Sequence, residues 1–193
     1  MFKLLLFPVC WLIAFGSSGQ APPAAFPDTS TITENSVGKA RIRMPVSELK
    51  SLYKTCTFTP THLMQYGFDD TDAKPNGVAV SYGGQKLFVY FADWQTHRRV
   101  ACLLAFHSAY KTVKGIRVGA TSGQLAAAVP GVRVVPNMML PVFQTAFAGK
   151  LEKPGLEYIF FKQKDLGNYV VADEPAKLVV RDAKISWIQV YPH

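Results

Sequence analysis

The chain has 193 residues, of which 49% are hydrophobic and 18% charged. This composition excludes a disordered or collagen-like chain and is sufficient for a substantial hydrophobic core. The net charge of +8 favours anionic partners such as acidic proteins or envelope polymers. Because the basic residues are spread along the chain, a solubilising surface is a simpler interpretation than a dedicated anion site.

The first 21 residues have the pattern of a secretory signal peptide. Lys3 supplies a positive charge, residues 4–15 are apolar, and small residues follow. The apolar run is shorter than the roughly 20 residues that a membrane-spanning helix needs. Cleavage after Ala21 would leave 172 residues and a net charge of +7, since Lys3 is the only charge lost. Cleavage after Gly19 and an uncleaved anchor are the alternatives. We therefore expect a periplasmic or secreted protein without stable membrane insertion.

Two cysteines, Cys56 and Cys102, lie beyond the predicted signal peptide. In an oxidising compartment an even number of cysteines favours a disulfide, and two cysteines allow one pairing. Two buried free thiols are the alternative.

Residues 22–36 are rich in Pro, Ala, Ser and Thr and predict a flexible lead-in to a single domain over residues 37–193. A strand is expected at 39–44, followed by a helix from Ser47, its N-cap, to about Lys54. Residues 55–76 show little regularity. Their acidic stretch, 69–72, predicts a solvated loop rather than a calcium site, because the glycine and distal glutamate of an EF-hand are absent.

The segment GVAVSYGGQKLFVYF, residues 77–91, predicts a β-hairpin. Two β-rich runs flank Gly83 and Gly84, which form a two-residue hairpin turn. This turn would place Val80 opposite Leu87 and Val78 opposite Val89.

The polar turn DWQTHRR, residues 93–99, contains the candidate binding residues Trp94, His97, Arg98 and Arg99. Aromatic and arginine side chains are favoured at interfaces. The alternative is that Trp94 covers the hairpin edge while the arginines are solvated.

Residues 114–130, KGIRVGATSGQLAAAVP, predict a strand at 115–118, a turn at Gly119 and a short helix opened by Thr121 or Ser122. Gly119 can adopt the positive φ that a sharp reversal needs. Thr121 with Gln124 has the spacing of a capping box.

The remaining apolar runs predict strands at 100–106, 132–135, 142–147, 156–162, 177–181 and 185–191. Trp187 and Tyr191 share a face by the period of two. The expected fold is α+β, a mostly antiparallel curved sheet with a few short helices.

Two segments match at a constant offset, because Arg41-Ile42 aligns with Arg117-Val118 and Glu48-Leu49 aligns with Gln124-Leu125. They predict two tandem strand–helix–hairpin repeats, 37–112 and 113–193. The alternative is that strand–turn–helix junctions converge on similar residues.

No pattern typical of an active site is present. None of His62, His97, His107 and His193 has a partner at metal-ligand spacing, and HExxH, CxxC, P-loop and GxSxG motifs are absent. Basic and aromatic residues form no nucleic-acid-binding motif. We therefore predict no catalytic residue, metal, cofactor or nucleic acid.

Residues 110–125 resemble a pattern in secreted bacterial proteins of unknown function, YxT-xxGIxVGxT-xxxL, which follows a buried strand and opens a short helix. The segment ARIRMPVSEL, residues 40–49, resembles the first half of the same arrangement. A looser similarity exists to small envelope domains with a GMTxxEV helix entry, including tandem-repeat inhibitor folds. The resemblance implies an exported α+β domain and carries over no catalytic residue.

Three functions follow from these observations. The first is a non-enzymatic envelope protein that binds an envelope component or another protein. The second is a protein inhibitor or immunity-type factor directed against an envelope-targeting enzyme. The third is a hydrolase with a dispersed site, in which His107 or His62 would meet a carboxylate.

Overall fold

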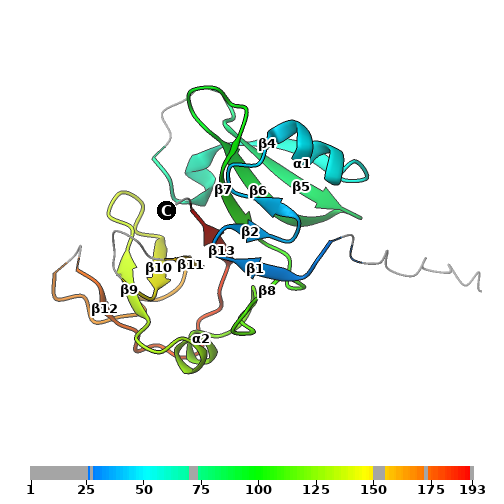
Figure 1. Cartoon of the computed structure of the whole chain (residues 1–193). Helices are drawn as coiled ribbons and strands as arrows, with labels where there is room; N and C mark the ends of the chain where they lie inside the picture. Colours follow the sequence, from blue (N-terminus) through cyan, green and yellow to red (C-terminus); the bar gives the residue numbers. More distant parts are fainter. Residues whose placement is uncertain (1–25, 27, 70–73, 150–154, 172–173, 192–193) are drawn as a thin grey trace, which may run out of the picture.

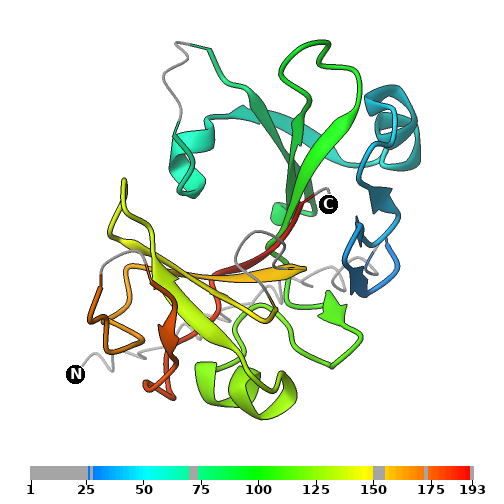
Figure 2. The same cartoon turned by 60° about the vertical axis from the view of Figure 1, so that its left-hand side comes forward.

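The computed structural model describes residues 26, 28–69, 74–149, 155–171 and 174–191. The predicted signal peptide and most of the acidic stretch 69–72 lie outside the described residues. Within them the fold is α+β, as predicted, with two short α-helices beside a mostly antiparallel curved sheet (Figures 1 and 2). None of the helices in these ranges is long and apolar enough to cross a membrane.

The elements follow one another along the chain in a simple order. They are β1 (Thr31–Thr33), β2 (Ser36–Val37), β3 (Ala40–Arg41), α1 (Val46–Leu52), β4 (Thr57–Thr61), the 3₁₀ helix η1 (Leu63–Tyr66), β5 (Gly77–Tyr82), β6 (Gln85–Ala92), β7 (Val100–Ala105), β8 (Lys111–Thr112), α2 (Ser122–Ala128), β9 (Arg133–Pro136), β10 (Phe143–Phe147), β11 (Leu156–Phe161), β12 (Ala176–Lys177) and β13 (Trp187–Val190). Strand β4 and η1 lie in the stretch for which no regular structure was predicted. The strand predicted at 177–181 shares only Lys177 with the observed strand β12.

The large sheet has nine strands in the order β12-β9-β10-β11-β13-β7-β6-β5-β4. Strands β4 to β7 form one antiparallel run, and β9, β10, β11 and β13 form another. The two runs join where β7 pairs antiparallel with β13. Pro60 lies in β4 at the edge of the sheet, where its missing N–H costs no ladder hydrogen bond.

The small sheet, in the order β3-β2-β1-β8, corrects the prediction of a flexible lead-in. Ile32 in β1 is fully buried, and β1 pairs in parallel with β8. Before this strand, the Asp28 carboxylate accepts hydrogen bonds from the hydroxyls of Tyr53 and Tyr110. These contacts hold the segment against the body of the protein, because they bury a polar group with its partners.

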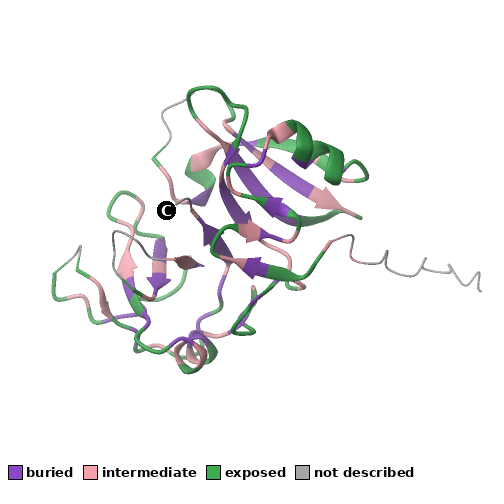
Figure 3. Cartoon of the chain, viewed as in Figure 1, coloured by how far each residue is buried: buried purple, intermediate pink, exposed green. Residues whose placement is uncertain are grey.

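Two hydrophobic clusters lie on opposite faces of the large sheet. Leu49 of α1 and Leu125 of α2 belong to the cluster on one face. The second cluster contains Tyr66, Phe91, Phe143 and Trp187 and lies on the other face. Figure 3 shows the buried stretches of the central strands in purple and the outer side of α1 in green. We call the second surface the aromatic face.

The hairpin β5–β6 forms as predicted, with Gly83 and Gly84 both at positive φ, but its predicted register is wrong. A β-bulge next to Val80 shifts the pairing by one residue, so that Val80 lies opposite Phe88. The bulge allows Leu87 and Phe88 to be buried together in the cluster on the helix side. Both faces of this hairpin are therefore covered.

The two helices begin differently. Thr121 is the N-cap of α2 and forms the predicted capping box with Gln124, and Gly119 has a φ of +82°. The strand predicted at 115–118 is reduced to an isolated bridge at Arg117. The N-cap prediction for α1 is wrong: Pro45 occupies that position without a side-chain cap, and Ser47 lies inside the helix.

The predicted disulfide is not formed, and both Cys56 and Cys102 are free. Cys102 belongs to the cluster of the aromatic face, whereas Cys56 packs against the cluster on the helix side. Alternation along β7 causes this separation, because Leu103 and Cys102 point to opposite faces of the sheet. Burial raises the pKa of the Cys102 thiol well above its usual value.

Candidate functional site

The centre of the aromatic face is Trp187 on β13. Its indole stacks on Phe106 at a ring-centroid distance of 5.4 Å and contacts Phe143 at 5.8 Å and Tyr66 at 6.0 Å, both edge to face. Phe161 lies 6.2 Å from the same ring. These side chains come from both runs of strands, so the face depends on the junction of β7 with β13.

Two connections cross this face, η1 from the first run of strands and residues 137–142 from the second. The Asn137 side chain joins them by donating to the Gly67 carbonyl at 2.6 Å. Gly67 has a φ of +88°, and a Cβ there would lie 3.1 Å from the Phe143 ring. Both features require glycine at the point where the connections meet. Figure 2 shows the β9–β10 connection directed towards η1.

Exposed methionines mark the outer surface of these two connections. Met64 in η1 is 52% exposed, and Met138 and Met139 are 58% and 72% exposed. The chain has five methionines, and of the four after the first residue only Met44 is buried. We call Met64, Met138 and Met139 the methionine rim.

Polar side chains interrupt the aromatic face beside Trp187. Glu157 on β11 accepts a hydrogen bond at 2.5 Å from the Gln189 side chain on β13. Burial raises the pKa of the Glu157 carboxyl, an effect that Gln189 partly offsets. Burial also raises the pKa of the nearby Tyr191 hydroxyl, with smaller contributions from Cys102 and Glu157.

Two buried polar atoms in this region have no hydrogen-bond partner within the described part of the chain, Oε1 of Gln189 and Nε1 of Trp187. A cavity of about 160 Å³ lies beside Gln189, lined also by Glu157 and Tyr191 among others. An unpaired buried acceptor costs about 1–3 kcal/mol of stability. The side chains at this point are therefore poorly suited to a purely structural role.

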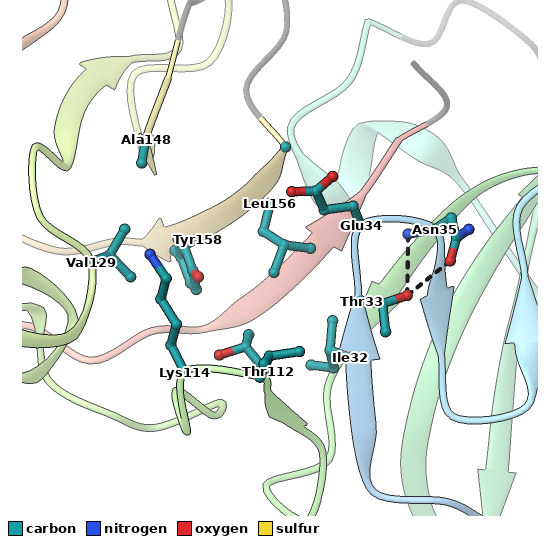
Figure 4. Close-up of a pocket in the computed structure, with 12 residues that line it drawn as sticks. Ile32, Thr33, Glu34, Asn35, Thr112, Lys114, Val129, Ala148, Leu156 and Tyr158 are labelled. Carbon is teal, nitrogen blue, oxygen red and sulfur yellow. Dashed lines mark hydrogen bonds between the residues drawn. The ribbon is translucent and has the colours of Figure 1, made fainter.

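A larger cavity of about 500 Å³ lies on the other side of the sheet, between the β1–β2 hairpin and β11. Figure 4 shows the Lys114 side chain extending towards Val129 and Tyr158, while Glu34 lies beside Leu156. Burial raises the pKa of Tyr158 to about 12, so its hydroxyl is neutral at physiological pH. The walls could hold an apolar group, but both charged side chains are exposed and the lining contains no nucleophile paired with a base.

The predicted binding residues Trp94, His97, Arg98 and Arg99 are all exposed on the turn between β6 and β7. Trp94 is 82% exposed, so it does not cover the hairpin edge. The Asp93 carboxylate builds the turn by accepting hydrogen bonds from the main-chain N–H groups of Arg98 and Arg99 at 3.1 and 3.0 Å. None of these side chains lines the cavity beside Glu157.

His107 does not meet a carboxylate. Its Nε2 lies 2.6 Å from the Gln85 side-chain oxygen, and its Nδ1 accepts from the main-chain N–H of Ala109 at 3.2 Å. The ring also stacks on Phe26. With both nitrogens occupied, His107 is poorly placed as a general base. Across the described ranges no group of three or more His, Cys, Asp or Glu side chains could hold a metal ion.

Sequence reasoning missed Glu157, Gln189 and the methionine rim. A signal for the first two was present, because each is a polar residue at an alternating position within an otherwise apolar strand, LEYIFF and WIQV. No comparable local pattern marks the rim, since its residues meet through the contact between two distant connections.

No protein-family model and no curated protein matches the chain. Among solved structures, the chain is similar to the uncharacterized protein yfeY from Escherichia coli, at 13% sequence identity and a TM-score of 0.50. The match covers 84% of this chain and 99% of that chain. At this identity the similarity concerns the fold alone.

Proposed function

We propose that this chain is an exported, non-enzymatic envelope protein that binds another protein through the methionine rim, beneath which the aromatic face is buried. The observation that carries the proposal is the exposure of Met64, Met138 and Met139 on two connections whose residues Leu63 and Leu140 pack against the aromatic cluster. Methionine side chains adapt to irregular surfaces and are over-represented at binding surfaces, whereas exposed methionines contribute nothing to the core.

A protein suits this surface better than an anionic polymer. The carboxyl group beside the aromatic face is that of the half-buried Glu157, whose ionised form would repel an anion. The Lys86 ammonium that contacts the face already lies over the rings of Tyr66 and Phe106, at 5.4 and 4.8 Å. The ammonium of Lys86 therefore already has aromatic partners within the chain.

We also propose that the chain consists of two tandem copies of one unit, helix and four-stranded meander. Helices α1 and α2 have seven residues each, and their N-caps, Pro45 and Thr121, are separated by the same offset as the aligned residues Arg41 and Arg117. Two residues before each N-cap, Arg43 and Gly119 both have positive φ. A convergent junction would not need to share all of these features.

Hydrogen bonds at the two helix entries support the same alignment. Three bonds link the first entry to the start of β7: Arg43 N–H to Val100 C=O at 2.7 Å, Val100 N–H to Met44 C=O at 2.9 Å, and Val46 N–H to Arg98 C=O at 2.9 Å. Their counterparts in the second half are Gly119 N–H to Ile185 C=O at 2.8 Å, Ile185 N–H to Ala120 C=O at 3.0 Å, and Ser122 N–H to Ala183 C=O at 2.8 Å. In this alignment Leu104 and Gln189 are counterparts, and they lie opposite each other on β7 and β13.

The binding proposal is tested by capture from periplasmic extract with the tagged mature chain, the triple variant Met64→Gln, Met138→Gln, Met139→Gln, and the control Trp94→Gln. We expect a partner that the wild type and the control retain and the triple variant loses. With that partner purified, calorimetry should give a Kd at least about tenfold higher for the triple variant, since hot-spot truncations cost more than about 1–2 kcal/mol.

Equal capture by all three proteins would overturn the proposal. If the partner is an enzyme, its activity in the complex decides between an inhibitor or immunity-type factor and a binding protein that leaves the enzyme active.

A further inference from the structure

One row of side chains across the aromatic face changes from apolar to polar at the junction of the two runs. Val89, Leu104, Gln189 and Glu157 lie opposite one another on β6, β7, β13 and β11. Val89 and Leu104 are fully buried. In the proposed repeat, Glu157 is the counterpart of Val89 and Gln189 that of Leu104, so only the second half carries polar groups in this row.

We infer that the cavity beside Glu157 receives a cationic side chain, the ammonium of a lysine or the guanidinium of an arginine, from the bound partner. The inference rests on the proposed function and names the group that anchors the partner. The cavity of about 160 Å³ is lined by Glu157 and Gln189 and by the rings of Tyr66, Phe68, Phe143 and Tyr191.

The chemistry of the cavity selects a cation over other groups. Glu157 supplies a carboxylate, and Gln189 Oε1 is a buried acceptor without a partner in the described part of the chain. An apolar group would leave Gln189 Oε1 unpaired, and an anion would be repelled by the ionised Glu157. A lysine or arginine donates to both acceptors while its charge lies against aromatic rings.

Ring faces of the same cluster already hold ammonium groups of this chain. Lys86 Nζ lies 4.8 Å from the centroid of Phe106, and Lys162 Nζ lies 5.0 Å from that of Phe161. The cavity offers a third such environment, with a carboxylate added.

Binding of a cation at this cavity depends on pH with a defined sign. Burial raises the pKa of Glu157, and a bound cation favours the ionised carboxylate, so binding releases a proton wherever Glu157 is protonated in the free protein. Affinity therefore rises with pH and levels off once Glu157 is ionised. The other titratable groups facing Glu157 are Cys102, Tyr66 and Tyr191. Burial raises the pKa values of Cys102 and Tyr191, so both stay neutral over this range.

The test uses Nα-acetyl-lysine methylamide and Nα-acetyl-arginine methylamide as probes, with Nα-acetyl-norleucine methylamide as the uncharged control. The readout is the indole N–H signal of Trp187 in ¹H–¹⁵N spectra of the mature chain. Trp187 lies next to the cavity in the aromatic cluster, whereas the exposed Trp94 provides an internal reference. Ligands of this size are expected to bind with a Kd of about 1 mM.

We expect the cationic probes to shift the Trp187 signal in a saturable way, with little effect on Trp94 and a weaker response to norleucine. Glu157→Gln should raise the Kd at least about tenfold, equivalent to about 1.4 kcal/mol, while the exposed Glu174→Gln, with the same change of charge, should not. Wild-type affinity should fall as the pH is lowered, and the pH dependence should disappear in Glu157→Gln.

Several results would overturn the inference: no saturable response to either cationic probe, equal binding of norleucine, or an unchanged Kd in Glu157→Gln. Its failure is distinguishable from failure of the proposed function. The triple methionine variant could lose a partner that Glu157→Gln still binds with unchanged affinity. That result would support binding at the methionine rim and exclude a cation of the partner from the cavity.

Discussion

Replacing Gly119 by alanine isolates the cost of one backbone conformation. Gly119 has a φ of +82°, and its N–H donates to the Ile185 carbonyl at 2.8 Å, which holds it in place. A Cβ at this position would meet no heavy atom within 4 Å, so the substitution adds no clash. The left-handed conformation costs an L-residue about 1–2 kcal/mol, and alanine recovers about 0.4–1 kcal/mol by restricting the unfolded chain. We expect a net loss of about 1 kcal/mol, a fall in Tm of about 2–4 °C.

Arg43→Gly is the matched variant with the opposite sign. Arg43 is exposed, has a φ of +65°, and donates its N–H to the Val100 carbonyl at 2.7 Å. Glycine removes the strain but frees the unfolded chain, so the free energy of unfolding should rise by up to about 1 kcal/mol. Urea denaturation of both variants at pH 7 tests the pair. An unchanged midpoint for Gly119→Ala, or equal losses in the two variants, would refute the reasoning.

Three further predictions concern stability and reactivity. Thr121→Ala removes the side-chain cap of α2 and should lower the free energy of unfolding by about 1 kcal/mol in urea melts, whereas a change below about 0.3 kcal/mol would contradict the capping box. Burial and Asp28 raise the pKa values of Tyr53 and Tyr110, so wild-type stability should be full below about pH 10, the unfolded value, and fall above it. Tyr53→Phe should lessen that fall, and a midpoint independent of pH up to about 11 would be inconsistent with it. Under native conditions an alkylating reagent should label Cys56 well before the buried Cys102, and a chain two hydrogens lighter than its reduced form would contradict the free thiols.

The parts of the fold that could be predicted depend on local chemistry. The Gly83–Gly84 turn and the capping box at Thr121 are set by residues adjacent in sequence, and both form. The register of the hairpin could not be predicted, because the bulge next to Val80 depends on the space available for Leu87 and Phe88 in a distant core. The turn was therefore predicted correctly from local residues, but long-range packing changed the register of the two strands.

The ordered lead-in could not be predicted for a similar reason. Composition alone favoured flexibility, but Asp28 finds its partners 25 and 82 residues away, at Tyr53 and Tyr110. The disulfide was predicted from the number of cysteines alone, which does not show on which face of the sheet each cysteine lies. Alternation along β7 places Cys102 on the aromatic face, whereas Cys56 packs on the helix side, so the two thiols lie on opposite faces of the sheet.

The candidate site was missed because its residues lie far apart in sequence. The turn at Trp94 attracted attention as a contiguous cluster of aromatic and basic residues, whereas the aromatic face assembles side chains from η1, β7, β10, β11 and β13. Trp187 and Tyr191 were predicted to share a face, and both pack in this cluster. What could not be foreseen is that Glu157 would lie on the same face.

The polar residues of this face are best understood by comparison with the other half of the chain. In the proposed repeat, Val89 and Leu104 occupy the positions that correspond to Glu157 and Gln189. Apolar side chains therefore suit these positions of the fold without the free-energy cost of burying polar groups. A half-buried carboxyl with a raised pKa beside an unpaired buried acceptor breaks the local rule of an apolar core, and such exceptions are concentrated at functional sites. Under the proposed repeat and the proposed function, the first half is an internal reference for structure alone, and the polar residues of the second half mark the binding site.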